Sequence, residues 1–250
     1  MQEIQETFLS HLIELRERLV RSLVAIGILL VPALYFSSEL YDLLAQPLMS
    51  TLPPGAHMIA TGVITPFLIP MKIAAMAAFM GALPYVLFQA WAFVAPGLYA
   101  HEKKLVLPLI VSSTILFFSG MAFCYFIVFG RVFAFIAKFA PQSVSVAPDI
   151  EAYFNFVLGM FLAFGLAFEV PVVVVLLVLT GIINTDQLRE FRGYVVVAIF
   201  TLAAFITPPD AISMISLAIP MCILYEVGIL AAQLVERRRK RESAPEGGRD

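Results

Sequence analysis

The chain has 250 residues, of which 61% are apolar and only 14% are charged, and its formal net charge is −2. A soluble domain carries about 45–50% apolar and about 25% charged residues, so this chain has too few polar side chains to cover a soluble core. The composition predicts an integral membrane protein, and the small net charge gives no overall field that would attract nucleic acid.

The first element is an amphipathic helix, predicted over residues 1–21. Its apolar side chains recur every three or four residues, at Ile4, Phe8, Leu12 and Leu15, and charged residues occupy another face. Such a helix lies at the interface between lipid headgroups and water. Its start is acidic and no small-residue cleavage site follows the first apolar run, so we expect the segment to be retained rather than removed as a signal peptide.

Six apolar runs follow within residues 22–234, and each is predicted to cross the bilayer as a helix. A bilayer core about 30 Å thick requires about 20 apolar helical residues. The predicted spans are 22–38, 67–90, 105–130, 151–178, 194–207 and 212–234. The fifth provides only about 21 Å of helix, so we expect local thinning of the membrane or a shallow hairpin with the sixth.

Basic residues predict the orientation of these spans. Of the 16 Lys and Arg residues, 13 lie in segments 1–21, 91–104, 179–193 and 235–250. The intervening side has only Lys72, Arg131 and Lys138. The positive-inside rule therefore places both termini in the cytoplasm. Residues 235–250 are predicted to form a basic anchor followed by a disordered polar tail.

Glu169 is the clearest ionisable residue at membrane depth, because apolar residues flank it on both sides. A carboxylate there is costly unless it is protonated, hydrated or paired, so a functional role is the default hypothesis. The alternative is a protonated side chain that bonds a carbonyl freed by Pro171. A kink alone does not require an acid, which favours the functional interpretation.

Other acidic residues have simple structural explanations when each is taken alone. Glu14 could pair with Arg18 at i+4, and Glu102 could offset Lys103 and Lys104. Asp210 follows two prolines and could cap the next helix.

No motif indicates an enzyme or a cofactor. The sequence contains no GxxxxGK[ST], HExxH or GxSxG, and its histidines lie outside mid-span positions. Cys124 and Cys222 lie in apolar runs without CxxC or Cys/His spacing, so we expect neither a metal site nor a disulfide. We predict no catalysis, no ATP hydrolysis, no metal and no cofactor.

Read together, several segments resemble the TatC family, the multispanning subunit of the Sec-independent twin-arginine protein translocase. They are residues 10–16 (SHLIELR), 58–61 (MIAT), 89–99 (QAWAFVAPGLY), Glu102, 164–171 (FGLAFEVP) and 207–210 (TPPD). The resemblance runs over nearly the whole chain. It implies an all-α membrane protein whose six helices form a concave, cupped wall, with short fifth and sixth helices.

The resemblance also implies a function for particular residues. Glu14, Arg16, Phe93, Tyr99 and Glu102 would bind the signal peptide of a folded precursor protein, the two glutamates pairing with its consecutive arginines. Glu169 would receive the single-span TatA and TatB subunits through a polar side chain in their membrane helices. Further functional positions are Pro47, Pro208 and Asp210.

By the same resemblance the protein lies in the inner membrane of a bacterium, forms homo-oligomers within the receptor complex and depends on the proton gradient rather than on a nucleotide. Two other classes stay open on the residues. A proton-coupled small-molecule transporter would also explain Glu169, Asp210 and kinked helices, but it predicts saturable solute uptake by the chain alone. A structural assembly factor predicts partner binding without preference for twin arginines.

Overall fold

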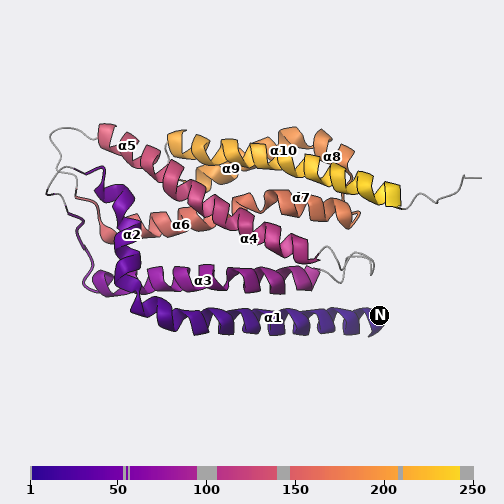
Figure 1. The fold of residues 1–250 in the computed structure, drawn as a ribbon, viewed down its shortest axis with the longest axis horizontal. Coiled ribbons are helices and arrows are strands. Elements are labelled where there is room, and N and C mark those ends of the chain that lie inside the picture. Colours follow the sequence, from indigo (N-terminus) through magenta and orange to yellow (C-terminus); the bar gives the residue numbers. More distant parts are fainter. Residues whose placement is uncertain are drawn as a thin grey trace, which may run out of the picture.

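The computed structural model describes residues 2–52, 55, 57–94, 106–139, 147–207 and 211–242, which are helical apart from turns, short loops and one isolated bridge between Ile59 and Asp149. The elements are α1 (Gln2–Tyr35), α2 (Ser37–Met49), α3 (Thr65–Val94), α4 (Val106–Phe123), the π-helical segment η3 (Cys124–Phe129), α5 (Gly130–Phe139), α6 (Ile150–Phe168), α7 (Val170–Leu179), α8 (Thr185–Glu190), α9 (Arg192–Ile206) and α10 (Ala211–Glu242). The long helices run along one common direction, and α2 lies across one end of them (Figure 1). The start of α1 and the end of α10 lie at the opposite end.

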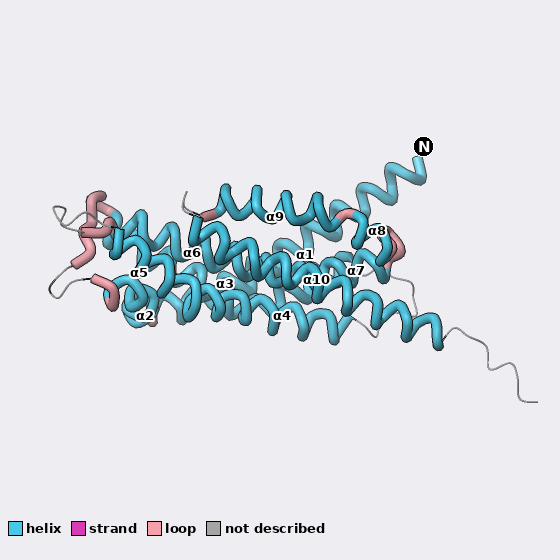
Figure 2. Tube along the Cα trace, turned by 90° about the horizontal axis from the view of Figure 1, so that it is seen from above, coloured by secondary structure: helices cyan, strands magenta, loops and turns pink. Residues whose placement is uncertain are grey.

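Five helical stretches in the described part of the chain are long and apolar enough to cross a membrane. They are His11–Tyr35, Thr65–Phe93, Leu107–Ile136, Ile150–Leu179 and Ala211–Arg237. The sixth apolar helix, α9, has 15 residues, about 22 Å, and lies along one side of the bundle (Figure 2). The all-α membrane fold predicted from the sequence is confirmed, and so is the short fifth helix.

The first and last helices have boundaries that differ from those predicted from the sequence. No break occurs after residue 21, because α1 continues as one helix from Gln2 to Tyr35. Ion pairs at i,i+4 between Glu14 and Arg18 and between Glu17 and Arg21 stabilise the helix up to this boundary. At the other end, α10 has 32 residues and includes most of the basic segment that was predicted as tail. The expected shortening therefore applies to α9 and not to α10.

Two of the spans change direction or pitch within the membrane. The third passes from α4 through η3 into α5, and the fourth breaks between α6 and α7 at Glu169. Pro171 explains the second break, because it has no N–H for the carbonyl of Ala167 and restricts the residue before it. The break places the Glu169 side chain at a helix junction.

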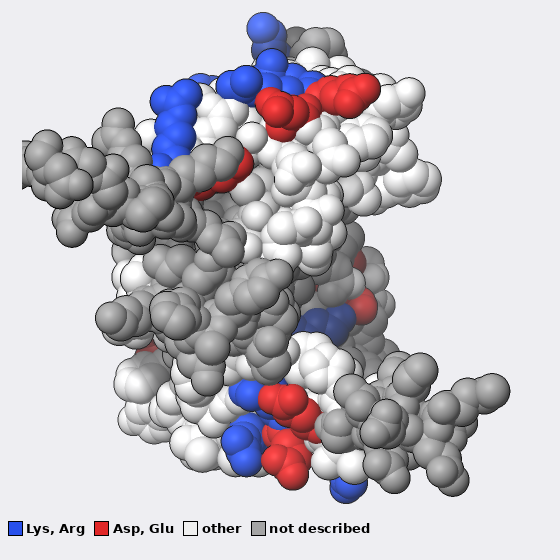
Figure 3. Space-filling model, turned by 90° about the vertical axis from the view of Figure 1, so that its right-hand side faces the viewer, with Lys and Arg blue, Asp and Glu red and all other residues white. Residues whose placement is uncertain are grey.

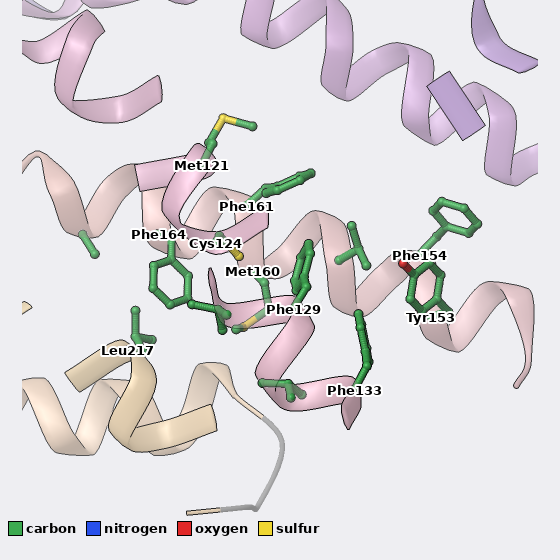
Figure 4. Packing of buried hydrophobic residues seen from close by; sticks show 14 of the residues in the cluster. Met121, Cys124, Phe129, Phe133, Tyr153, Phe154, Met160, Phe161, Phe164 and Leu217 are labelled. Carbon is green, nitrogen blue, oxygen red and sulfur yellow. The ribbon is translucent and has the colours of Figure 1, made fainter. Parts of the chain in front are cut away.

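The core of the bundle lies where η3 and α5 pack against α6. Phe129 contacts Phe133 and Phe161 at ring-centroid separations of 5.6 and 5.4 Å. Leu217 of α10 faces Phe164 across this cluster (Figure 4). Since lipid is as apolar as these side chains, close van der Waals packing and not hydrophobic transfer holds the helices together.

Small residues allow the helices to approach closely. A Cβ atom added at Gly120 of α4 would lie 2.5 Å from the backbone oxygen of Phe164 and 2.9 Å from Cγ of Phe168. At Gly228 of α10, an added Cβ would lie 2.9 Å from Cα of Pro171. These glycines bring α4 against α6, and α10 against α7, on either side of Glu169.

Candidate functional site

The predicted signal-peptide residues that the structure describes lie near the end of the bundle that holds the start of α1 and the end of α10. Glu14 is in α1, and its Oε1 atom accepts hydrogen bonds from Nε and Nη2 of Arg18, at 3.0 and 2.6 Å. The two side chains are 36% and 21% exposed. The carboxylate of Glu14 is thus oriented by a guanidinium on its own helix.

Two residues of the neighbouring helix α3 complete this cluster. Nη1 of Arg18 donates to Oε1 of Gln89 at 3.3 Å. The ring of His11 stacks on Phe93 with centroids 4.3 Å apart, and its Nδ1 atom lies 3.8 Å from Oε2 of Glu14. We call His11, Glu14, Arg18, Gln89 and Phe93 the α1–α3 cluster. Within it, Oε1 of Glu14 is used by Arg18, whereas Oε2 has no hydrogen bond from another described side chain.

The other residues predicted to bind the signal peptide are not part of the α1–α3 cluster as the structure describes it. Arg16 is exposed on α1 and makes no hydrogen bond or ion pair to another side chain in the described part of the chain. Tyr99 and Glu102 lie outside the described residues. The structure thus brings together Glu14 and Phe93.

Sequence reasoning missed His11, Arg18 and Gln89 as members of the site. Arg18 was considered only as an i+4 partner of Glu14, and its second contact spans 71 residues of sequence. His11 and Gln89 stand in the segments that carry the family resemblance, which was the available signal for both.

Charged side chains gather at two places on this end of the molecule (Figure 3). The lower group belongs to α1, and the upper group to the region of α8, α9 and α10. In the upper group Nη2 of Arg192 lies 2.6 Å from Oε2 of Glu226, and Thr185 donates to Oε2 of Glu236 at 3.2 Å. Glu226 therefore joins α10 to the start of α9.

Glu169 is buried at the junction of α6 and α7, and only 7% of it is exposed. Neither carboxyl oxygen has a hydrogen-bond partner among the described residues. The hydroxyl of Ser113 lies near Glu169 but is not hydrogen-bonded to it. Its oxygen instead accepts a hydrogen bond from Nε1 of Trp91 at 3.0 Å. The site is therefore a polar group in an apolar wall that still has hydrogen-bonding capacity.

At the opposite end, the connection before α3 is fastened to the start of α6. Ile59 forms a parallel bridge beside Asp149, and both the N–H and the hydroxyl of Thr61 donate to Oδ1 of Asp149, at 3.2 and 2.9 Å. The N–H of Ala152 donates to the other oxygen. This backbone donor, followed by those of Thr61, holds the pKa of Asp149 below its usual value.

Pro47 has a structural explanation in α2. Because proline has no N–H, the carbonyl of Leu43 lacks its helical donor. The hydroxyl of Tyr125 in η3 donates to that carbonyl at 2.9 Å, and the hydroxyl of Tyr153 in α6 donates to the carbonyl of Leu44 at 2.6 Å. Pro47 thereby helps to fasten α2 across the bundle. Pro208 and Asp210 lie outside the described residues.

A search of the described residues finds no group of three or more His, Cys, Asp or Glu side chains that could hold a metal ion. Glu14 in the α1–α3 cluster and Glu169 at the α6–α7 junction are single carboxyl groups, which can accept hydrogen bonds and, when ionised, pair with a positive charge.

Comparisons with known proteins identify the family of the chain. The model of the TatC family, described as Sec-independent protein translocase protein, matches residues 10–220. The TatC protein of Haemophilus influenzae is 47% identical over 231 residues, which cover 92% of this chain and 90% of that protein. The TatC protein of Escherichia coli K12 is 45% identical over 241 residues, covering 96% and 93%.

Solved structures agree. The crystal structure of the twin-arginine translocase receptor TatC superposes with a TM-score of 0.78 at 36% identity, covering 90% of this chain and 99% of that one. A second crystal structure of that receptor, in DDM, gives a TM-score of 0.79 at 36% identity, covering 89% and 99%.

Proposed function

Because the chain belongs to the TatC family and is a component of a protein translocase, we propose that it is the subunit that binds twin-arginine signal peptides and assembles its partners for export. The observation that carries this proposal is the α1–α3 cluster. It presents one oriented carboxylate, Glu14, and an aromatic ring, Phe93, near the end of the bundle that holds the start of α1 and the end of α10.

The geometry of Glu14 suits an arginine from another chain. Oε1 is held by Arg18, so the plane of the carboxylate is fixed, and Oε2 remains available for a second guanidinium. A planar guanidinium forms directional, charge-assisted bonds that an ammonium does not reproduce. Glu102 would supply the second carboxylate, with Arg16 and Tyr99 nearby. The apolar segment of the signal peptide would then lie along the helix wall.

Orientation follows from the same proposal. Basic residues are concentrated at the end that holds the termini, so the positive-inside rule places this end in the cytoplasm of a bacterium, where a targeting peptide arrives first. The α1–α3 cluster would face the cytoplasm. The fastening of Thr61 to Asp149 would face the other side of the inner membrane.

Glu169 is proposed to receive the membrane helices of the single-span TatA and TatB subunits. Its burial and its unused hydrogen-bonding capacity support this role, because a polar side chain on an approaching helix would satisfy it. Export by several copies of this receptor assembled with these partners would then be driven by the proton gradient, with no cofactor.

The test of peptide binding uses two glutamates on the same helix. Glu14→Gln removes the charge of the proposed contact. Glu17→Gln is a matched control, because Glu17 pairs with Arg21 at 3.4 Å and the two side chains are 62% and 60% exposed. Given the 36% exposure of Glu14, we expect a loss of about 1–2 kcal/mol, about 5- to 30-fold in affinity for a twin-arginine peptide. Binding would be measured with the purified chain in nanodiscs.

Three outcomes separate the candidates. Selective loss with Glu14→Gln, together with weaker binding of a twin-lysine peptide, supports recognition by Glu14. Equal losses in both variants would show that only the overall charge of α1 matters. Full binding by both variants would remove Glu14 from the recognition site.

A further inference from the structure

A groove open to the surroundings runs between α10 and the third span. Its volume is about 460 Å³. It is lined by Phe123, Ile127, Val128, Arg131, Phe168 and, from α10, residues 215, 216, 219, 220, 223 and 224. Apart from one serine and Arg131, these side chains are apolar. A second apolar cavity, of about 410 Å³ beneath α2, has no charged side chain in its lining.

Arg131 lies near the end of the third apolar span, Leu107–Ile136. Counted from Leu107, where the third apolar span begins, it is about 36 Å along the helix, and the hydrocarbon core is about 30 Å thick. The third span is inclined to the neighbouring helices (Figure 1), so its rise across the bilayer is shorter than its length along the helix axis. A long arginine side chain at this depth extends its head toward the phosphates.

No carboxylate in the described part of the chain pairs with Arg131. Lys72, also near this end, differs, because its Nζ lies 3.7 Å from Glu151 and donates to Asn155 at 3.0 Å. Arg131 is exposed and forms one wall of the groove. Its charge is thus presented to whatever occupies that groove.

The apolar lining of the groove, with one arginine at its end, suits a lipid chain. Along the third span the lining runs from Phe123 to Arg131, about 12 Å of helix. A helix with its side chains is about 10–12 Å across, so only one face of it would enter a groove of this length. An acyl chain is far thinner, and it is the apolar group that surrounds this surface in a bilayer.

We propose that this groove is a binding site for an anionic phospholipid, with the phosphate on Arg131 and an acyl chain along the apolar face of α10. The arginine fork matches the geometry of phosphate oxygens. Apolar contact alone would not distinguish this lipid from its neighbours, so the selectivity comes from the arginine. The lipid would fill the space between α10 and the third span on one side of the core.

The experiment titrates the purified full chain in detergent with phosphatidylglycerol or with phosphatidylcholine of the same acyl chains, and bound lipid is counted by native mass spectrometry. Arg131→Gln should weaken phosphatidylglycerol binding about 10-fold or more, to the level of phosphatidylcholine. Lys138→Gln is the matched control, since Lys138 is exposed on the same helix α5 but is absent from the groove lining. It should change binding less than twofold.

Two further variants test the headgroup and the groove separately. Arg131→Lys keeps the charge and should recover part of the selectivity. Ile219→Trp fills the groove beside an intact Arg131, and it should weaken binding of phosphatidylglycerol. Unchanged melting temperatures without lipid would show that each variant is folded.

Certain results would overturn the proposal. Equal losses for Arg131→Gln and Lys138→Gln would indicate general attraction to charge. Equal binding of both lipids by the wild type would exclude headgroup selectivity. A photo-reactive residue at position 219 that captures a polypeptide in cells, rather than a lipid, would assign the groove to a partner helix.

Discussion

Replacing Gly120 with alanine tests the close helix contact next to Glu169. The new Cβ would lie 2.5 Å from the backbone oxygen of Phe164 and 2.9 Å from the ring of Phe168. Because the nearer atom belongs to a helix backbone, it cannot move aside as the end of a flexible side chain would. Overpacking of this kind costs about 1–3 kcal/mol.

A smaller gain opposes that cost. Alanine is better than glycine in a helix by about 0.5–1 kcal/mol, so the net destabilisation should be at most about 2.5 kcal/mol. For a domain of this size that corresponds to a decrease of up to roughly 10 °C in melting temperature. Since Phe168 precedes Glu169, displacement of α6 should also shift the buried carboxyl and weaken partner recruitment.

Gly159 on α6 provides the control, because a Cβ added there would meet nothing within 4 Å. Gly159→Ala should therefore raise the melting temperature slightly, through helix propensity alone. Thermal unfolding of both purified variants in the same detergent measures the difference. If Gly120→Ala is as stable as Gly159→Ala, α4 and α6 do not pack as closely as described.

The remaining predictions concern three polar positions. Glu169→Ala should weaken recruitment of the single-span partners about 3- to 30-fold in a co-purification assay, with peptide binding retained, and normal transport by this variant would contradict the role. Glu169→Gln keeps the hydrogen bonding, so activity of this variant would exclude proton uptake at the site. Tyr125→Phe leaves the carbonyl of Leu43 without its donor and should lower the melting temperature by an amount equivalent to about 0.5–1.5 kcal/mol; no change would mean that water replaces the hydroxyl. The lowered pKa of Asp149 stabilises the fold above the unfolded-state pKa of about 3.9, and this contribution is lost as the pH falls through the lower folded value. The stability difference between wild type and Asp149→Asn should therefore shrink between pH 7 and pH 3, and a constant difference would show that the carboxylate charge is not involved.

The sequence by itself determined the membrane class, the approximate positions of the spans and the isolation of Glu169, because hydropathy and helix length are local properties of consecutive residues. It also indicated the short fifth helix. The family resemblance carried Glu14 and Phe93 into one predicted site, although no local pattern relates a residue of the first helix to one 79 positions later.

Only the tertiary structure decided which groups meet. Arg18 reaches Gln89, Tyr125 satisfies the carbonyl that Pro47 frees, and Gly120 allows α6 to approach α4 beside Glu169. The sequence also did not predict that α1 continues as one helix past residue 21. An amphipathic pattern fits both an interfacial helix and a helix that packs along the bundle. These features depend on how neighbouring helices are rotated and spaced, and close packing of side chains determines both. Hydropathy does not encode them, because one apolar helix face has much the same hydropathy as another.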